Sequence, residues 1–170
     1  DQLVESIKER GIITPVTLRQ KPDGRYEIVS GHRRTKACEL AGLTTVKAEI
    51  KELSRDEAII LMVESNLQRT TILPSEKAFS YKMRLEAVKR QGQRTDLTLS
   101  PVGTKLERSS DELTAETGDS RNQIHRYIRL THLIPPLLDL VDSGKIAFRP
   151  AVELSYLTKE EQNSLLDSIS

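Results

Sequence analysis

Residues 26–37 read Tyr26-Glu27-Ile28-Val29-Ser30-Gly31-His32-Arg33-Arg34-Thr35-Lys36-Ala37. The first five of these residues are typical of a strand, and Gly31 then opens a helix. Toward the N-terminus, Val16-Thr17-Leu18-Arg19 alternates apolar and polar residues as an earlier strand. Because Lys21-Pro22-Asp23-Gly24 supplies turn residues between the two strands, we expect a β-hairpin that leads directly into a helix.

The segments on either side extend this α/β pattern. Apolar residues over 3–7 have the spacing of an amphipathic helix, and Gly11 lies where that helix would stop. The helix that Gly31 opens is expected to end near Ala41-Gly42, and residues 46–50 alternate as a third strand. The first part of the chain is therefore predicted to be a small mixed α/β unit.

Beyond residue 50 the pattern is helical. Pro74 has the fixed backbone angle that a first helical turn requires, so a helix is predicted from Ser75 to Gln91. The stretch 91–108 lacks periodicity and carries Gly, Pro, Ser and Thr, which predicts a connector or mobile loop. Helix starts are indicated by capping boxes, in which the two side chains bind each other's backbone amides, at Ser54/Glu57, Ser109/Glu112, Ser120/Gln123 and Thr158/Glu161.

The expected fold class is α+β, with the mixed unit over 1–72 and an all-α domain over 73–170. The chain of 170 residues has 36% hydrophobic and 30% charged residues and a net charge of +1, which is ordinary for a soluble globular protein. No apolar run approaches the roughly 20 residues of a membrane helix. A single Cys38 excludes an internal disulfide and a Cys-rich zinc site, so a cytoplasmic location is expected.

Gly31-His32-Arg33-Arg34 is the first candidate binding site. The N-terminus of a helix carries partial positive charge from unpaired amides, so basic residues in its first turn are electrostatically misplaced unless an anion is present. Free amides, a close-approach glycine and guanidinium groups together predict a phosphate site. The alternative is that the arginines point to solvent or pair with Glu27 and Glu39.

Glu64-Ser65-Asn66-Leu67-Gln68-Arg69 is the second candidate, late in the helix that starts at Ser54. Offsets of three and four place Ser65, Asn66 and Arg69 on one face, where they could meet a second ligand or a metal-bound phosphate. Asn is a poor residue for a helix interior, which favours a functional role. The alternative is a solvated helix end.

The third candidate is a helix-turn-helix at about 109–131. A short helix with Leu113, a turn at Thr117-Gly118-Asp119-Ser120 and a second helix with Ile124 and Ile128 facing inward form this pattern. Asn and Gln match adenine edges, and Arg matches guanine and phosphate. A structural helical hairpin is the alternative. The residues expected to bind DNA are Ser120, Arg121, Asn122, Gln123, His125, Arg126 and Arg129.

These residues resemble the ParB partition-protein family in three sequence motifs, which occur in the family's order, and in the helix-turn-helix with its following Leu133-Ile134-Pro135-Pro136. The motifs are Val4-Glu5-Ser6-Ile7-x-x-x-Gly11-Ile12-x-x-Pro15-Val16, then Gly31-His32-Arg33-Arg34-x-x-Ala37, then Asn66-Leu67-Gln68-Arg69-x-x-x-x-Pro74-x-Glu76-x-Ala78. The match covers nearly the whole chain.

The resemblance implies a centromere-binding protein that loads at a palindromic double-stranded DNA site, binds CTP with Mg²⁺ and closes as a sliding clamp. Such proteins act beside a ParA-like ATPase to segregate plasmids, chromosomes or mobile elements. It implies a homodimer that is cytoplasmic and DNA-associated, and a C-terminal dimerisation domain that we expect to be absent from these 170 residues. It implies that Asn66 helps to hold the metal, and that the nucleotide site includes Thr14, Pro15, Gly31, His32, Arg33, Arg34, Ser65, Asn66 and Arg69.

Two departures from the family pattern bear on hydrolysis. The family usually has Glu where this chain has His32, and usually has Glu directly before the asparagine, where this chain has Ser65. Glu64, the one candidate catalytic residue, lies one position early and would point about 100° away on a helix. We therefore expect CTP binding with slow CTP hydrolysis.

Three other functions compete with this interpretation. A helix-turn-helix transcription regulator would bind no nucleotide, and a phosphotransferase or nuclease would turn over a substrate other than CTP. Sulfiredoxin has a similar small α/β fold, but its active loop resembles Gly-Cys-His-Arg, and Gly31 here is followed by His32. Cys38 is instead expected to be a small buried residue.

Overall fold

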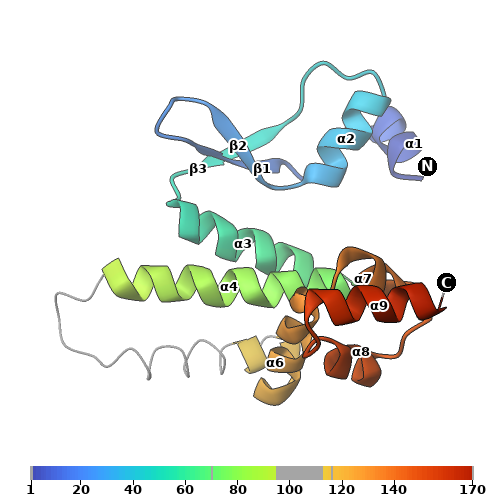
Figure 1. Ribbon diagram of the computed structural model, residues 1–170. Helices are drawn as coiled ribbons and strands as arrows, with labels where there is room; N and C mark the ends of the chain where they lie inside the picture. The colour runs from blue at the N-terminus through green and yellow to red at the C-terminus, as the bar shows by residue number, and fades with distance from the viewer. Residues whose placement is uncertain (1, 70, 95–112, 116, 170) are drawn as a thin grey trace. The chain divides into compact units, whose positions relative to one another are not determined.

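A computed structural model of the chain describes residues 2–69, 71–94, 113–115 and 117–169. The chain divides into two compact units, Asp1–Ser65 and Asn66–Ser170. The first unit contains a sheet and helices, and the elements described in the second unit are helices joined by turns (Figure 1). The predicted fold class is thus confirmed, whereas the expected domain boundary after residue 72 stays a prediction.

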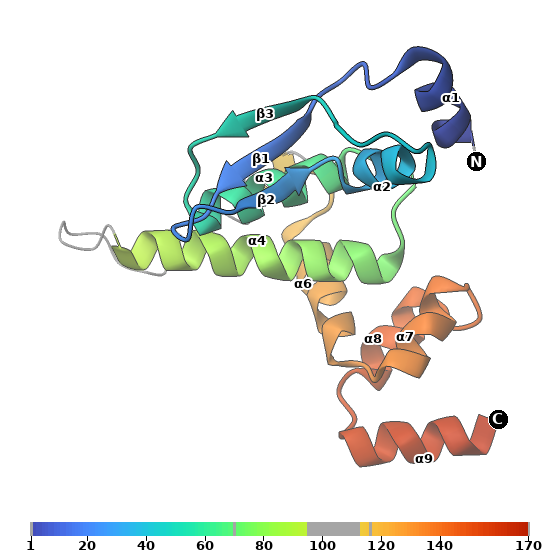
Figure 2. The ribbon, with the colours of Figure 1, turned by 90° about the horizontal axis from the view of Figure 1, so that it is seen from above.

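The first unit is built on a three-stranded sheet in the order β2-β1-β3. Strands β1 and β2 pair antiparallel as the predicted hairpin, and β3 pairs parallel to β1 (Figure 2). Parallel pairing requires a crossover, which the helix between β2 and β3 supplies. The elements are α1 (Gln2–Arg10), β1 (Val16–Gln20), β2 (Tyr26–Ser30), α2 (His32–Leu40), β3 (Ala48–Lys51) and α3 (Arg55–Leu67).

Helices α1 and α2 share a small apolar core. Val4 and Ile7 of α1 pack with Ala37 and Cys38 of α2, and all four are buried. The expected burial of the single cysteine is confirmed. Gly11 ends α1 as predicted, because its positive φ of 68° turns the chain while its amide donates to the Ile7 carbonyl at 2.9 Å.

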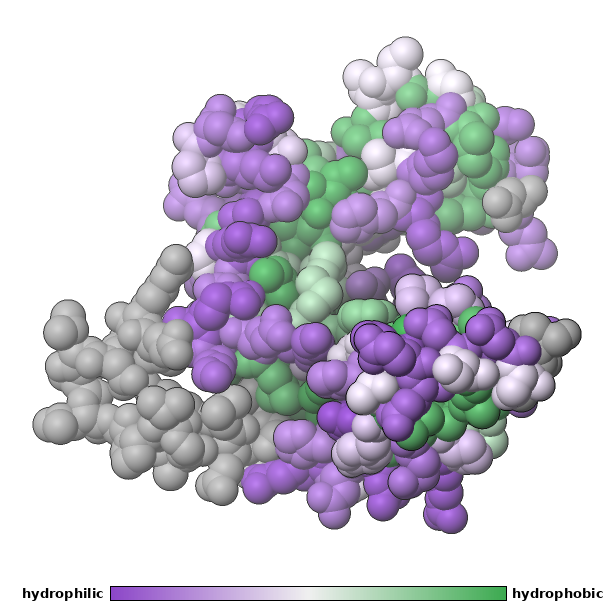
Figure 3. Space-filling model, viewed as in Figure 1, coloured by the Kyte–Doolittle hydropathy of each residue, from purple (hydrophilic) through white to green (hydrophobic). Residues whose placement is uncertain are grey.

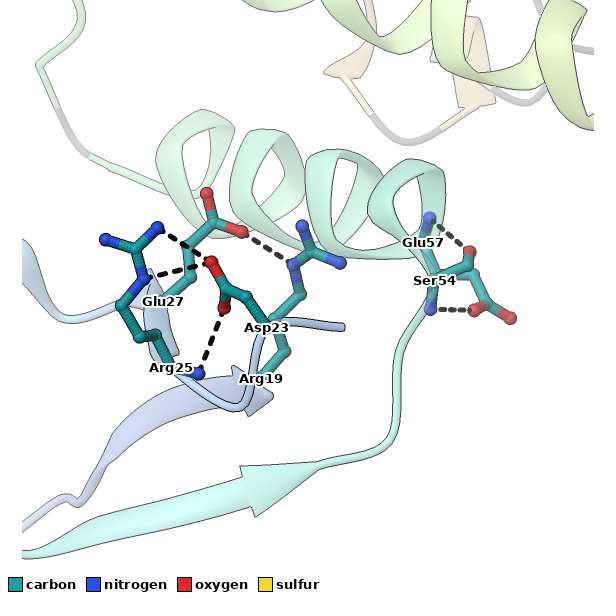
Figure 4. A network of polar contacts seen from close by, with 6 residues as sticks. All are labelled: Arg19, Asp23, Arg25, Glu27, Ser54 and Glu57. Atoms are coloured by element: carbon teal, nitrogen blue, oxygen red, sulfur yellow. Dashed lines mark hydrogen bonds and ion pairs between the residues drawn. The ribbon is translucent and has the colours of Figure 1, made fainter. Parts of the chain in front are cut away.

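Polar contacts fix the hairpin and the start of α3 (Figure 4). Arg19 is 8% exposed, and its Nε donates to Glu27 Oε2 at 2.6 Å across paired strands. Hydrogen bonds from Arg25 hold the pKa of the Asp23 carboxyl below its usual value. The predicted capping box is formed in full, since the Ser54 amide donates to Glu57 Oε2 at 2.7 Å and the Glu57 amide donates to Ser54 Oγ at 3.3 Å.

The second unit begins at Asn66, at the end of α3, and its first complete helix is the long helix α4 (Pro74–Arg94). Pro74 is its first residue, as predicted, but the helix continues past Gln91, so the first residues of the expected connector are helical instead. The correction has a simple cause: Gly92 is tolerated within a helix at a cost of about 1 kcal/mol. The remainder of that connector and the Ser109/Glu112 capping box lie outside the described residues.

Helices after residue 112 complete the second unit. Residues 113–115 are helical, and the following elements are α6 (Arg121–Arg129), a 3₁₀ turn η1 (Leu130–His132), α7 (Pro135–Asp142), α8 (Phe148–Leu154) and α9 (Lys159–Ile169). The capping box at the start of α9 is confirmed in both directions, because the Thr158 amide donates to Glu161 and the Glu161 amide donates to Thr158. Leu130, Leu137 and Ala151 are fully buried in the core that joins these helices.

Two long-range polar contacts hold this core together. Gln162 of α9 is 1% exposed, and its side chain accepts from the Ile134 amide at 2.8 Å and donates to the Leu157 carbonyl at 3.0 Å. Asp142 at the end of α7 accepts from the amide and hydroxyl of Ser75, at the start of α4. The outer face of α9 is mainly hydrophilic (Figure 3).

Among the described residues, no helix is long and apolar enough to cross a lipid bilayer.

The junction between β2 and α2 depends on Gly31. Its φ is 106°, and a Cβ added there would lie 2.8 Å from Val16 Cγ1 and 3.1 Å from Val16 Cβ. Both the backbone angle and the close approach to β1 therefore require glycine. Gly24 in the hairpin turn also has a positive φ, of 82°, but none of the described atoms lies within 4 Å of its Cβ position.

We predict that Gly31→Ala is more destabilising than Gly24→Ala. Both substitutions bear the left-handed backbone strain, but at Gly31 the new methyl group also overlaps Val16, which adds about 1–3 kcal/mol. Urea unfolding of the two variants followed by circular dichroism measures the difference. Equal free energies of unfolding would contradict the close approach.

Candidate functional sites

The first candidate site lies at the N-terminus of α2. Gly31 is the N-cap and has no side chain that could cap the first-turn amides. The first turn contains no acid, and His32 and Arg33 are exposed there. Open amides beside exposed basic side chains create positive potential, so this helix end can accept an anion.

Arg34 has a different position from Arg33. Its Nη1 donates to the Pro15 carbonyl at 2.8 Å and to the Thr14 carbonyl at 2.5 Å. The structure thus brings together Thr14, Pro15 and Arg34 of the expected site, because Arg34 attaches the loop before β1 to the first turn of α2. In this arrangement the Arg34 guanidinium holds the loop, and its assignment as a phosphate ligand stays a prediction.

Ser65 lies at the C-terminal end of β2, next to the start of α2. Its Oγ lies 2.8 Å from Ser30 Oγ, and Ser30 directly precedes Gly31. Sequence reasoning missed Ser30, because a hydroxyl at a strand end has no periodic signal and its partner is 35 residues away. The contact connects α3 to the strand that leads into the α2 turn.

Asn66 and Arg69 belong to the second unit. The Asn66 carbonyl accepts from the Arg69 amide at 3.2 Å, and the Arg69 guanidinium lies 3.8 Å from the Glu76 carboxylate. Their expected roles as nucleotide and metal ligands, like those of Ser65 and Glu64, stay predictions. In the described residues, no group of three or more His, Cys, Asp and Glu side chains could hold a metal ion.

The second candidate site is the helix-turn-helix. Gly118 has a φ of 72° in the turn, and its amide donates to the Thr114 carbonyl at 3.0 Å, so the preceding helical segment ends there. Ser120 then caps α6, because its Oγ accepts from the Gln123 amide at 3.3 Å. The predicted turn and the Ser120 half of its capping box are both present.

Burial separates the two faces of α6. Ile124 is fully buried with Tyr81 and Leu113, and Ile128 packs against the same cluster. Gln123 is half-buried at the edge. The exposed face consists of Arg121, Asn122, His125 and Arg126. A helix with such a face at its N-terminal part has the chemistry to read a major groove.

Arg129 is engaged within the protein. Its guanidinium donates to the Ser155 carbonyl at 2.6 Å and to Ser155 Oγ at 3.2 Å, and it lies 4.0 Å from the centre of the Tyr156 ring. These contacts connect α6 to the end of α8. The expected phosphate contact by Arg129 stays a prediction, and its guanidinium already has partners in this structure. Burial, and then the charge of Arg129, lower the pKa of His132.

A pocket of about 380 Å³ lies between α6 and α8. Arg126 lines it from α6, and Phe148, Arg149, Val152 and Glu153 line it from α8. Arg149 is an exposed basic residue that lines this pocket together with Arg126, and it is not among the residues that the sequence predicted to bind DNA.

Comparison with protein families gives two matches. Residues 1–67 match the model of the ParB N-terminal domain, and residues 98–170 match the model of the ParB HTH domain. The two matches follow each other in the same order as the two candidate sites.

Similar proteins include two named for chromosome partitioning. The chain is 31% identical over 161 residues to the chromosome-partitioning protein Spo0J of Thermus thermophilus, covering 95% of this chain and 52% of that protein. It is 30% identical over 164 residues to the probable chromosome-partitioning protein ParB of Neisseria meningitidis, covering 96% of this chain and 51% of that protein. The chain thus spans about half the length of these curated relatives.

A solved structure has the same fold. The C-terminally truncated chromosome-partitioning protein ParB of Caulobacter crescentus, complexed to the centromeric parS site, superposes with a TM-score of 0.54 at 25% identity. The match covers 97% of this chain and 87% of that one.

Proposed function

This chain belongs to the ParB family. We propose that it binds a specific palindromic DNA site and CTP, and that it closes as a clamp on DNA. Its role is in the segregation of a plasmid, chromosome or mobile element. The observation that carries the proposal is the capped helix α6, which exposes a polar and basic face and buries Ile124. The names of the relatives, which are chromosome-partitioning proteins, support the same role.

DNA is read by the N-terminal half of α6. We assign Asn122, Gln123 and Arg126 to the bases, and Arg121 and Arg129 to the phosphates. A phosphate contact by Arg129 requires its guanidinium to exchange the bonds that it makes to Ser155. The fold match to a ParB complexed to a parS site supports this docking. Because a palindrome presents two equal half-sites, the DNA-bound form is a homodimer, and a ParA-like ATPase is the partner that moves the complex.

CTP occupies the α2 end. The open first-turn amides and the exposed Arg33 bind the triphosphate, and Arg34 fixes the Thr14–Pro15 loop that borders the nucleotide. The residues fit a triphosphate because the first turn of α2 contains no acid and exposes the basic side chains of His32 and Arg33. The selection of cytosine rests on the family resemblance alone.

Mg²⁺ accompanies the triphosphate. It commonly keeps several waters and takes few protein ligands beside substrate phosphates, so a site without a carboxylate cluster remains compatible with it. The amide oxygen of Asn66 is the ligand that this chain offers. When bound, the ion neutralises phosphate charge.

A helix-turn-helix regulator that ignores nucleotides is the second candidate function, because α6 alone would suffice for it. Calorimetric titration of the chain with CTP, with and without the DNA site, separates the two. A regulator gives no heat of CTP binding, whereas the proposed clamp binds CTP.

Arg33→Ala should lower CTP affinity roughly ten- to a hundred-fold, since loss of a charge-assisted contact costs about 1.5–3 kcal/mol. Arg34→Ala should lower both the affinity and the stability of the first unit, because it also frees the Thr14–Pro15 loop. Calorimetry and urea unfolding measure the two effects, with Arg25→Ala, at the hairpin, as control. Unchanged affinity in Arg33→Ala, or equal binding of all four nucleotides, would contradict the site.

Gln123→Ala and Arg126→Ala should each weaken site-specific DNA binding by about 1–3 kcal/mol and relax base preference, because both face the bases. Arg121→Ala should instead reduce the salt dependence of binding, because it faces a phosphate. Fluorescence anisotropy at several salt concentrations distinguishes the classes, and Asn163→Ala on α9 is the control. Intact site-specific binding in both base-facing variants would show that α6 is not the reading helix.

CTP is hydrolysed slowly. A ligand shifts an open–closed equilibrium by differential affinity alone, so closure needs no turnover. Hydrolysis also needs a group that orients water, and Ser65 has no charge for this role.

Ser65→Glu should therefore raise turnover more than affinity, as measured by phosphate release with DNA present. Ser65→Ala is the matched control, because it loses the 2.8 Å contact to Ser30 without adding a carboxylate. Brisk turnover by the unaltered chain that Glu64→Gln abolishes would show that Glu64 has the catalytic role.

A further inference from the structure

Asp119, the residue directly before the N-cap of α6, is held by two side chains of α4. Lys77 Nζ lies 2.6 Å from Asp119 Oδ2, and the Tyr81 hydroxyl donates to the same oxygen at 2.5 Å. All three residues lie within the second unit. The turn of the helix-turn-helix is thus attached to a long helix that comes before it in the chain.

The contact is largely shielded from water. Tyr81 is fully buried, and the side chains of Lys77 and Asp119 are 22% and 21% exposed. Burial and the neighbouring carboxylate raise the pKa of Tyr81, so the hydroxyl remains a hydrogen-bond donor. A partly buried charge is tolerated when it is paired, and removal of either partner leaves the other unpaired.

The same two α4 residues also contact the body of α6. Lys77 Nζ lies 4.8 Å from the centre of the Tyr127 ring, within the range of a cation–π contact. Tyr81 meets Tyr127 edge to face, with ring centres 5.9 Å apart. Lys77 and Tyr81 therefore hold α6 at two points, at the turn before it and in its second half.

We propose that Lys77 and Tyr81 are positioning residues that act through Asp119 to set the orientation of α6 for reading bases. The inference rests on the proposed function, because it assumes that α6 reads DNA. Two points of attachment fix the direction of a helix where one point would leave it able to rotate. Base contacts require accurate placement of side chains, whereas phosphate contacts tolerate small shifts.

This role predicts a particular pattern of binding losses. If Lys77 positions α6, Lys77→Met should weaken binding to the cognate duplex and leave the salt dependence unchanged. If Lys77 instead contacted a phosphate, the same variant should weaken binding to every duplex and reduce the salt slope by roughly one.

The test uses two duplexes: the sequence that the unaltered chain enriches from a random pool, and a scrambled duplex of equal composition. The variants are Lys77→Met, Asp119→Asn and the double exchange Lys77→Glu with Asp119→Lys. Lys89→Met removes a charge from the exposed side of the same helix and is the matched control. Hydrogen–deuterium exchange of residues 117–129 in the DNA-free chain reports the attachment without reference to DNA.

Each single variant should bind the cognate duplex roughly three- to thirty-fold more weakly, the range expected for a coupled pair. Binding to the scrambled duplex should be unchanged, exchange in residues 117–129 should be faster, and the double exchange should recover part of both losses. Unaltered exchange and cognate binding in the single variants, or equal losses on both duplexes, would overturn the inference. If the unaltered chain enriches no sequence while the exchange results hold, the proposed function fails and the attachment stands.

Discussion

The close approach of Gly31 to Val16 is the contact on which the first unit depends. Because the backbone at Gly31 leaves no room for a Cβ, α2 begins directly against β1, and its first-turn amides lie open beside Arg33. The same approach brings Arg34 within reach of the Thr14 and Pro15 carbonyls. One steric constraint therefore shapes the helix end, the loop that borders it and the positive potential between them.

The second unit is organised around the orientation of α6. Ile124 is buried on one side, Ser120 caps the start, and Arg129 joins the end to Ser155 of the segment after α8. Asp119 attaches the preceding turn to α4. The exposed polar face is thus presented by a helix that is fixed at its start, at its buried side and at its end, which is the condition for reading bases in a groove.

Local sequence patterns predict most of the helices and strands. The contacts between residues far apart in the chain could not be predicted from the sequence. Turn residues and apolar–polar alternation predict the hairpin, and the capping boxes that begin at Ser54 and Thr158 predict helix starts. These signals depend only on residues within three or four positions of one another. The contacts of Arg34, Arg129 and Gln162 join residues 19 to 28 positions apart and leave no periodic trace. The extension of α4 beyond Gln91 has no local sequence signal, because Gly92 is a poor helix former that the structure nevertheless accommodates within the helix.

If the α2 end is a nucleotide site, amide chemical shifts report CTP binding there most directly. A CTP titration of the isotope-labelled chain with Mg²⁺ present should move the amide resonances of residues 31–34 and of Thr14, Val16 and Thr17 first and farthest, because the triphosphate would lie against those groups. The hairpin turn at 21–24 should stay unchanged. Saturable shifts confined to other residues, or none at any residue, would contradict the account.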